Sequence, residues 1–326
     1  GERIKSEKGE SRYQDVFGEV LLDLARKNDR IVGITPAMAS GCGMNLLSSE
    51  MPERFYDVGI EEEHAVTFAA GLAAGGMKPF CNIYSSFSHR AFDQIFHDVA
   101  LQGLPVVLCL DRSGIVGEDG ATHHGCYDMA IYRTIPGAVI AAPKDEIELK
   151  DMMHSAMMSE SGPYIIRYPR GYGEGVDWKS HKAGLIETGK GEKLVDGSDI
   201  AVIAAGPVAN RAVEAAEKLR KSMNWNPSVY NIRYIKPIDK AILDEIADKY
   251  SCIVTIEDGT TIGGLHGAVA EYITQTHSST PVIPIAIPDR YLSQGTQEEL
   301  REECGLTASR IALTLAEEKK KTSKKV

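Results

Sequence analysis

Short apolar runs alternate with amphipathic segments along the first half of the chain. The runs are rich in β-branched residues and short enough for buried strands. They are RIVGIT (30–35), RFYDVGI (54–60), KPFCNIY (78–84), LPVVLCL (104–110), GAVIAAP (137–143) and GPYIIRYP (162–169). Segments with helical spacing of apolar residues lie between them, such as 13–28 and 145–158. Apolar strands separated by helices predict a mainly parallel sheet covered on both faces.

The second half repeats this alternation on a smaller scale. Strand-like runs occupy 199–206, 228–235, 252–258 and 281–288, and helix-like segments occupy 208–221, 239–250 and 264–275. A glycine-rich, irregular stretch separates the two halves. We therefore expect an α/β protein with two domains, each a mainly parallel sheet flanked by helices. The expected division is a polar tail or linker end 1–12, a first domain 13–175, a linker 176–190, a second domain 191–318 and a basic tail 319–326.

The stretch DVGIEEEHAVTFAAGLAAGG (57–76) places three consecutive glutamates before a long apolar run. Acids at the start of a helix are favoured by its dipole, by about 0.3–1 kcal/mol each. However, a helix that is apolar on all sides is usually buried. Glu61, Glu62 and Glu63 are therefore either helix-start acids or carboxyls that are partly directed toward the interior.

The composition limits the classes of function. A length of 326 residues fits two domains of about 150 residues. A net charge of −10 argues against a nucleic-acid or anionic-membrane surface. No apolar run approaches the roughly 20 residues that span a bilayer. The 6 cysteines form no C-x-x-C pair, so we expect reduced thiols and a cytoplasmic protein.

Polar clusters follow several of the predicted strands. Parallel strands in open α/β sheets present their carboxyl ends to a ligand site. The clusters contain Glu61–Glu63 and His64, then Tyr84, Phe87, His89 and Arg90, then Asp111, Arg112, Asp119, His123 and His124, and finally Arg170. Their convergence on one edge of one sheet predicts a binding site there.

Each of these residues also has an ordinary structural explanation. Arg90, Arg112 and Arg170 could form ion pairs with Asp93, Asp111 or Asp119. If two or three of the arginines instead converge, they suit a phosphorylated substrate, because guanidinium groups match phosphate oxygens. The adjacent histidines of THHG (122–125) lack an apparent third ligand, so we predict no metal site.

The chain from about Tyr13 to Leu315 resembles the C-terminal half of the 1-deoxy-D-xylulose-5-phosphate synthases, thiamine-diphosphate enzymes of the transketolase superfamily. The resemblance rests on ITPAM (34–38), FYDVGIEEEHAVTFAAGLA (55–73), IYSSF (83–87), RAFDQIFHDVA (90–100), DRSGIVGEDGATHHG (111–125), RYPRG (167–171) and PDRYLSQGTQEELREECGL (288–306). It implies a pyrimidine-binding domain followed by a transketolase-type C-terminal domain that supports subunit association, with a homodimer expected.

The resemblance also implies roles for individual residues. Glu62 would hydrogen-bond N1′ of the aminopyrimidine ring of thiamine diphosphate, with Ile60 and Phe87 completing the cofactor contacts. A dry site raises the pKa of an acid, which suits a carboxyl that must share a proton. The positions matching the acceptor's phosphate site are Tyr84, Arg112 and Arg170, with Arg90 close by. Asp119 and His123 would contact the acceptor and serve proton transfer.

The implied reaction joins pyruvate, with loss of carbon dioxide, to glyceraldehyde 3-phosphate. Its product would serve isoprenoid, thiamine and pyridoxal synthesis. Glu61 and Glu63 stand where the family commonly has Ala and Gln, and THHG replaces THQG, which makes His124 an additional titratable group. The family's G-D-G…N motif, which holds Mg²⁺ and the diphosphate, does not occur in this sequence.

We therefore expect a partial chain that needs an N-terminal diphosphate-binding domain or subunit and binds thiamine diphosphate weakly or not at all by itself. It could be a fragment of a longer enzyme, a proteolytic piece or one subunit of a split enzyme. Two other functions stay open: the C-terminal section of a split transketolase or of a 2-oxo-acid dehydrogenase β subunit, and a scaffold without catalytic activity that only dimerises.

Overall fold

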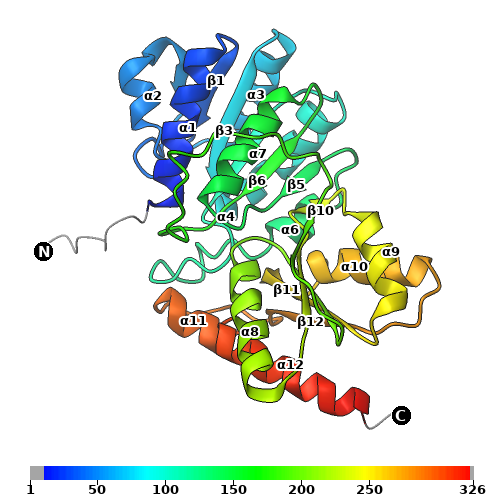
Figure 1. The fold of residues 1–326 in the computed structure, drawn as a ribbon. Helices are drawn as coiled ribbons and strands as arrows, with labels where there is room; N and C mark the ends of the chain where they lie inside the picture. The colour runs from blue at the N-terminus through cyan, green and yellow to red at the C-terminus, as the bar shows by residue number, and fades with distance from the viewer. Residues whose placement is uncertain (1–10, 324–326) are drawn as a thin grey trace, which may run out of the picture. The chain divides into compact units, whose positions relative to one another are not determined.

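The computed structural model describes residues 11–323, which divide into two compact units (Figure 1). The first unit contains the residues up to Arg112 together with Ile135–Glu187. The second contains Ser113–Thr134 and the residues from Thr188 on. The expected continuous first domain, 13–175, thus differs from the structure at 113–134. Residues 1–10 of the expected N-terminal tail lie outside the described part of the chain.

The elements of the first unit follow the predicted alternation. They are α1 (Tyr13–Lys27), β1 (Ile31–Thr35), α2 (Asn45–Glu50), η1 (Pro52–Arg54), β2 (Phe55–Asp57), α3 (Glu62–Ala74), β3 (Lys78–Tyr84), α4 (Ser85–Ser88), η2 (His89–Ala91), α5 (Phe92–Gln94), η3 (Ile95–Ala100), β4 (Val107–Asp111), β5 (Val139–Ala141), α7 (Glu146–Met158) and β6 (Tyr164–Arg167). Within this unit the strand order is β5-β6-β4-β3-β1-β2, and every pair in it is parallel.

The central strands of this sheet are covered on both faces. Every residue of β1, β3, β4 and β6 is buried. Side chains alternate between the two faces of a strand, so uninterrupted burial requires cover on each side. Helix α1 packs against α7, and α3 packs on β3 and β1. The α/β prediction for this half of the chain is confirmed.

Helix α3 is only partly buried, although its sequence is apolar almost all round. Its buried face holds Glu62, Ala65, Val66, Ala69, Ala70 and Ala73. The opposite face exposes His64, Thr67 and Gly71. The prediction that the whole run is buried is therefore wrong for this face, which presents a histidine and smaller residues to solvent.

The second unit also has a mainly parallel sheet with helices beside it, and this sheet has five strands. It contains α6 (Asp128–Tyr132), β7 (Glu192–Val195), β8 (Ala201–Ala204), α8 (Val208–Met223), β9 (Ser228–Asn231), β10 (Tyr234–Lys236), α9 (Lys240–Lys249), β11 (Ile253–Thr260), α10 (Leu265–Gln275), β12 (Val282–Ile287), α11 (Gln297–Glu303) and α12 (Ala308–Ser323). The order β12-β11-β8-β9-β7 is parallel except for the edge strand β7.

Helices α8 and α12 pack together, and Trp225, Leu219 and Leu315 lie in the apolar core of this unit. Part of the expected basic tail, 319–326, belongs to α12, which continues to Ser323. Residues 324–326 lie outside the described range.

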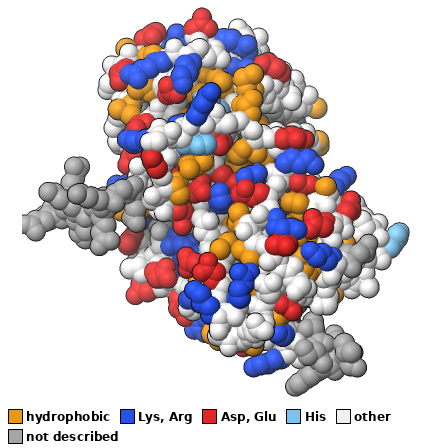
Figure 2. Space-filling model, in the orientation of Figure 1, with side chains coloured by type: hydrophobic (Ala, Val, Ile, Leu, Met, Phe, Trp, Pro, Cys, Tyr) orange, Lys and Arg blue, Asp and Glu red, His pale blue; other side chains and the backbone are white. Residues whose placement is uncertain are grey.

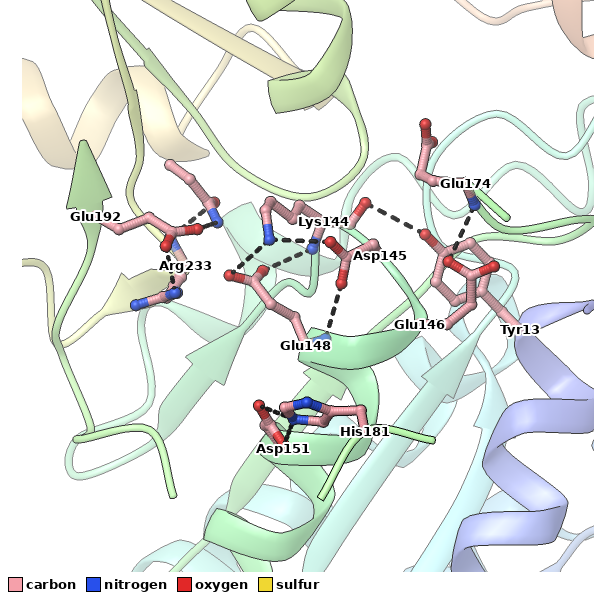
Figure 3. Close-up of polar contacts among 11 residues, drawn as sticks. Tyr13, Lys144, Asp145, Glu146, Glu148, Asp151, Glu174, His181, Glu192 and Arg233 are labelled. Carbon is pink, nitrogen blue, oxygen red and sulfur yellow. Dashed lines mark hydrogen bonds and ion pairs between the residues drawn. The ribbon is translucent and has the colours of Figure 1, made fainter. Parts of the chain in front are cut away.

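The segment expected to be a linker is fixed to the first unit as far as Glu187. Glu146, which is fully buried at the start of α7, accepts hydrogen bonds from the backbone N–H groups of Glu174 (3.0 Å) and Gly175 (2.9 Å). Nε2 of His181 lies 3.0 Å from Oδ1 of Asp151, which is also on α7 (Figure 3). Trp178 is 5% exposed. These contacts make 174–181 an ordered part of the unit rather than a free connection.

Acidic and basic side chains are interspersed on the face of the molecule drawn in Figure 2. Such mixing is typical of a solvated surface. Among residues 11–323, no helix is long and apolar enough to cross a membrane.

Candidate active site

The structure separates the three consecutive glutamates. Glu61 is exposed at the N-cap of α3, and Glu63 is half-buried. Glu62 is 2% exposed, and its Oε2 lies 3.3 Å from Nη1 of Arg90 on η2. The Arg90 side chain is 50% exposed, so its guanidinium lies between the buried carboxyl and solvent. One acid of the three is thus directed inward, with a cation beside it.

An aromatic pair connects Arg90 to a second arginine. The rings of Phe87 and Tyr84 are stacked, with centroids 5.6 Å apart and an angle of 25° between planes. The guanidinium carbon of Arg90 lies 5.7 Å from the centre of the Phe87 ring, and that of Arg112 lies 4.2 Å from the centre of the Tyr84 ring. Cations over aromatic faces are favourable by about 0.5–2 kcal/mol. Glu62, Arg90, Phe87, Tyr84 and Arg112 therefore form a continuous row at the carboxyl ends of β2, β3 and β4.

Arg112 is held in a defined orientation by the residue before it. Asp111, the last residue of β4, is completely buried. Its Oδ1 accepts the backbone N–H of Arg112 at 2.7 Å, and its Oδ2 accepts from Nη1 at 2.6 Å. Nη1 also donates to the carbonyl oxygen of Gly41 at 2.8 Å. Arg112 has a φ of 61°, in the left-handed region that is unfavourable for a side-chain-bearing residue. The bonds to Asp111 offset that strain.

The surroundings of Asp111 alter its acidity. Burial raises the pKa of this carboxyl to about 7, and the Arg112 guanidinium opposes the rise only in part. A carboxyl that titrates near neutrality beside a fixed guanidinium is typical of functional sites.

Two further predicted residues of the first unit, Arg170 and Ile60, differ in their exposure. Arg170 is half-buried, three residues after the end of β6. Ile60, which precedes the glutamates, is 77% exposed.

Asp119 and His123 lie on the loop between β4 and α6, which belongs to the second unit. Asp119 is exposed and His123 is half-buried. Nδ1 of His123 lies 2.9 Å from the hydroxyl of Thr122. The backbone of Gly114 pairs with that of Gly125 in both directions, at 2.8 and 2.9 Å, and closes the base of the loop.

The sequence reasoning missed the roles of Asp111, Gly41 and His124. Asp111 was considered only as an ordinary ion-pair partner, and the pair with Arg112 does form. Its position directly before an arginine at a strand end was a usable signal. Gly41 gave no such signal. His124, expected as an additional titratable group, is 4% exposed with both ring nitrogens in hydrogen bonds. Within the described residues no group of three or more His, Cys, Asp or Glu could hold a metal ion.

Comparisons with known proteins identify the family of both halves of the chain. The model "Transketolase, pyrimidine binding domain" matches residues 10–174, and "Transketolase, C-terminal domain" matches 189–311. A solved structure described as "Split gene transketolase, inactive beta4 tetramer" superposes with a TM-score of 0.84 at 28% identity, over 94% of this chain and 97% of that one.

Curated relatives share more of the sequence. The chain is 52% identical to the 1-deoxy-D-xylulose-5-phosphate synthase of Bacteroides thetaiotaomicron, over 90% of this chain and 45% of that protein. It is 49% identical to the enzyme of the same name from Azobacteroides pseudotrichonymphae, over 98% of this chain and 51% of that protein. The chain thus spans about half the length of the curated relatives that it matches. Since the pyrimidine-binding model alone covers half of its residues, the chain belongs to the transketolase family.

Proposed function

We propose that this chain forms the pyrimidine-binding and C-terminal part of a thiamine-diphosphate-dependent 1-deoxy-D-xylulose-5-phosphate synthase. The enzyme would join pyruvate, with loss of carbon dioxide, to glyceraldehyde 3-phosphate. The observation that carries the proposal is the buried carboxyl of Glu62 at the start of α3, next to Arg90 and the row that ends at Arg112. The names of the relatives support the choice of substrates.

The residues of the row suit the cofactor's aminopyrimidine ring. Glu62, whose carboxyl is 2% exposed, would hydrogen-bond N1′ of this ring. Phe87 would contact the ring, and Ile60 would supply apolar cover. When bound, thiamine diphosphate supplies the electron sink for decarboxylation of pyruvate. Contacts to Mg²⁺ and to the diphosphate would come from the partner domain.

The arginines suit the phosphate of the acceptor. Arg112 is oriented before any ligand arrives, since Asp111 and Gly41 fix its Nη1. A pre-oriented guanidinium loses little conformational freedom when it binds phosphate oxygens. Arg90 and Arg170 would add charge, and Tyr84 would add a hydroxyl. Asp119 and His123 would contact the hydroxyl and carbonyl of the acceptor and transfer protons.

The partner that we propose is a diphosphate-binding domain or subunit, within a homodimer. Support comes from the exposed face of α3, where His64, Thr67 and Gly71 follow the exposed Ile60. A Cβ at Gly71 would meet no atom within 4 Å beyond its own helix, so Gly71→Arg should fold normally yet weaken association. Ser222→Arg, on the exposed side of α8, is the matched control. Equal association of both variants with the partner would argue against this face.

The 6 buried free thiols support a reducing compartment, which we propose is the cytoplasm.

A second function follows from the name of the structural neighbour, a split-gene transketolase. The two functions differ in their donor. The chain would be combined with a matching diphosphate-binding half, thiamine diphosphate and Mg²⁺, and then supplied with glyceraldehyde 3-phosphate and either pyruvate or a ketose phosphate. Product formed with pyruvate as donor, and not with the ketose phosphate, supports the synthase. Product formed only with the ketose phosphate as donor would overturn it in favour of the transketolase.

A further inference from the structure

The loop that carries Asp119 and His123 is attached to a segment far away in the sequence. This loop, 115–124, starts and ends next to the paired glycines Gly114 and Gly125. The segment 293–297, with sequence SQGTQ, belongs to the same unit and directly precedes and begins α11. In the sequence, QGTQ is part of the family resemblance and has no predicted function.

His124 connects the two segments through its ring. Its Nδ1 accepts the backbone N–H of Val116 at 3.1 Å. Because Nδ1 acts as an acceptor, the proton is on Nε2, which donates to the carbonyl oxygen of Ser293 at 3.1 Å. The His124 side chain is 4% exposed, so water cannot take the place of either hydrogen bond. One imidazole thus closes the loop on itself and attaches it to Ser293.

Gln297 makes a second connection at the other side of the loop's base. Its Nε2 donates to the carbonyl oxygen of Ile115 at 3.0 Å. The start of α11, where Gln297 lies, is itself fixed, because Thr296 and Glu299 form a reciprocal capping box. The bond to Ile115 therefore comes from a rigid element.

On both sides of Asp119 the backbone of the loop passes close to glutamine side chains of 293–297. A Cβ at Gly117 would lie 3.2 Å from Cγ of Gln297, and one at Gly120 would lie 3.4 Å from Cβ of Gln294. Both glycines have positive φ, 102° and 75°. The loop thus follows the surface of 293–297 closely before and after the acid that it presents.

We propose that the segment 293–297 is a brace, which holds the loop 115–124 (the substrate loop) in place. His124 and Gln297 are then positioning residues for Asp119 and His123. The brace deepens the proposed function and rests on it for its consequence in catalysis. The loop is anchored at Ile115, Val116 and His124, so the residues between them have a restricted range of positions. Asp119 and His123 could then meet the acceptor at low entropic cost.

Hydrogen exchange tests the brace without any activity. His124→Ala in the full chain should speed exchange of the amides of 116–125 by about tenfold or more, since a buried hydrogen-bond network is lost. His124→Gln is the matched control, because its amide can accept from Val116 and donate to Ser293. Exchange in His124→Gln should stay within about threefold of the unaltered chain. Unchanged exchange in His124→Ala would overturn the brace.

Kinetics of the reconstituted enzyme tests its consequence. His124→Ala should lower kcat/KM for glyceraldehyde 3-phosphate by about tenfold and leave KM for pyruvate within about twofold, with His124→Gln restoring the loss. Gln297→Ala should act in the same direction. If the unaltered enzyme turns over and His124→Ala has normal acceptor kinetics, or His124→Gln gives no rescue, the positioning role is refuted. If exchange responds as expected but no reconstituted form turns over pyruvate, the proposed function fails and the brace stands.

Discussion

Asp111→Asn should change the pH dependence of folding of the first unit. Burial raises the pKa of the Asp111 carboxyl from 3.8 to about 7, against a partial opposing effect of Arg112. A pKa that is higher in the folded state means that the folded chain holds the proton more tightly than the unfolded chain does. The stability from this group is therefore fully present below about pH 4 and is lost as the pH rises through about 7.

The magnitude follows from the size of that shift. From 3.8 to about 7 is roughly three pKa units. At about 1.4 kcal/mol for each unit, the ionisation of Asp111 costs the folded state about 4 kcal/mol between pH 4 and pH 8. The Asn variant has no such titration. Its free energy of unfolding, relative to the unaltered chain, should therefore rise by about 4 kcal/mol across this range.

Urea unfolding followed by tryptophan fluorescence can measure this difference. Trp178 lies in the first unit and Trp225 in the second, so a Trp225→Phe background lets Trp178 report on the first unit. Cys109→Ala is the matched control, because Cys109 is buried on the same strand and burial raises its pKa well above this pH range.

Arg112→Met tests the partial opposing effect of the guanidinium. Removal of the guanidinium removes the interaction that lowers the pKa of Asp111, so the pH window should move upward. A free-energy difference between Asp111→Asn and the unaltered chain that is constant from pH 4 to pH 8 would refute the reasoning about the buried carboxyl.

Three other substitutions test the packing. Gly18→Ala should destabilise the first unit by about 1–3 kcal/mol in urea unfolding, because the new Cβ would clash with the backbone carbonyl oxygen of Gly43. Gly71→Ala should instead stabilise it by about 0.5–1 kcal/mol, since this helical position is open; equal effects would contradict both expectations. Thr296→Ala should cost the second unit about 1 kcal/mol through loss of the capping box, and an unchanged midpoint would argue against it.

The local pattern was sufficient for the buried strands but not for their ends. The run 54–60 forms a strand only over Phe55–Asp57, and Oδ1 of Asp57 accepts the N–H groups of Ala37 and Gly59 where the strand ends. Gly59, with a φ of 76°, then turns the chain toward α3. Such side-chain bonds to backbone groups leave no trace in the spacing of apolar residues.

The position of the substrate loop could not be predicted from periodicity. It depends on hydrogen bonds between residues 169 apart in the sequence, for His124 and Ser293, and 182 apart, for Ile115 and Gln297. The site in the first unit was more accessible to sequence reasoning. Glu62, Tyr84 and Arg112 lie at or just after the ends of parallel strands, where the topology alone brings side chains together.

Turnover by Glu62→Ala in the reconstituted enzyme is the most direct test of the central claim. The unaltered chain, combined with a diphosphate-binding half, thiamine diphosphate, Mg²⁺, pyruvate and glyceraldehyde 3-phosphate, should form product. Glu62→Ala should lower kcat by about 100-fold or more, because the proton at N1′ loses its carboxyl. Glu61→Ala, at the exposed N-cap one residue earlier, should retain most of the activity. Unchanged turnover in Glu62→Ala would contradict the assignment.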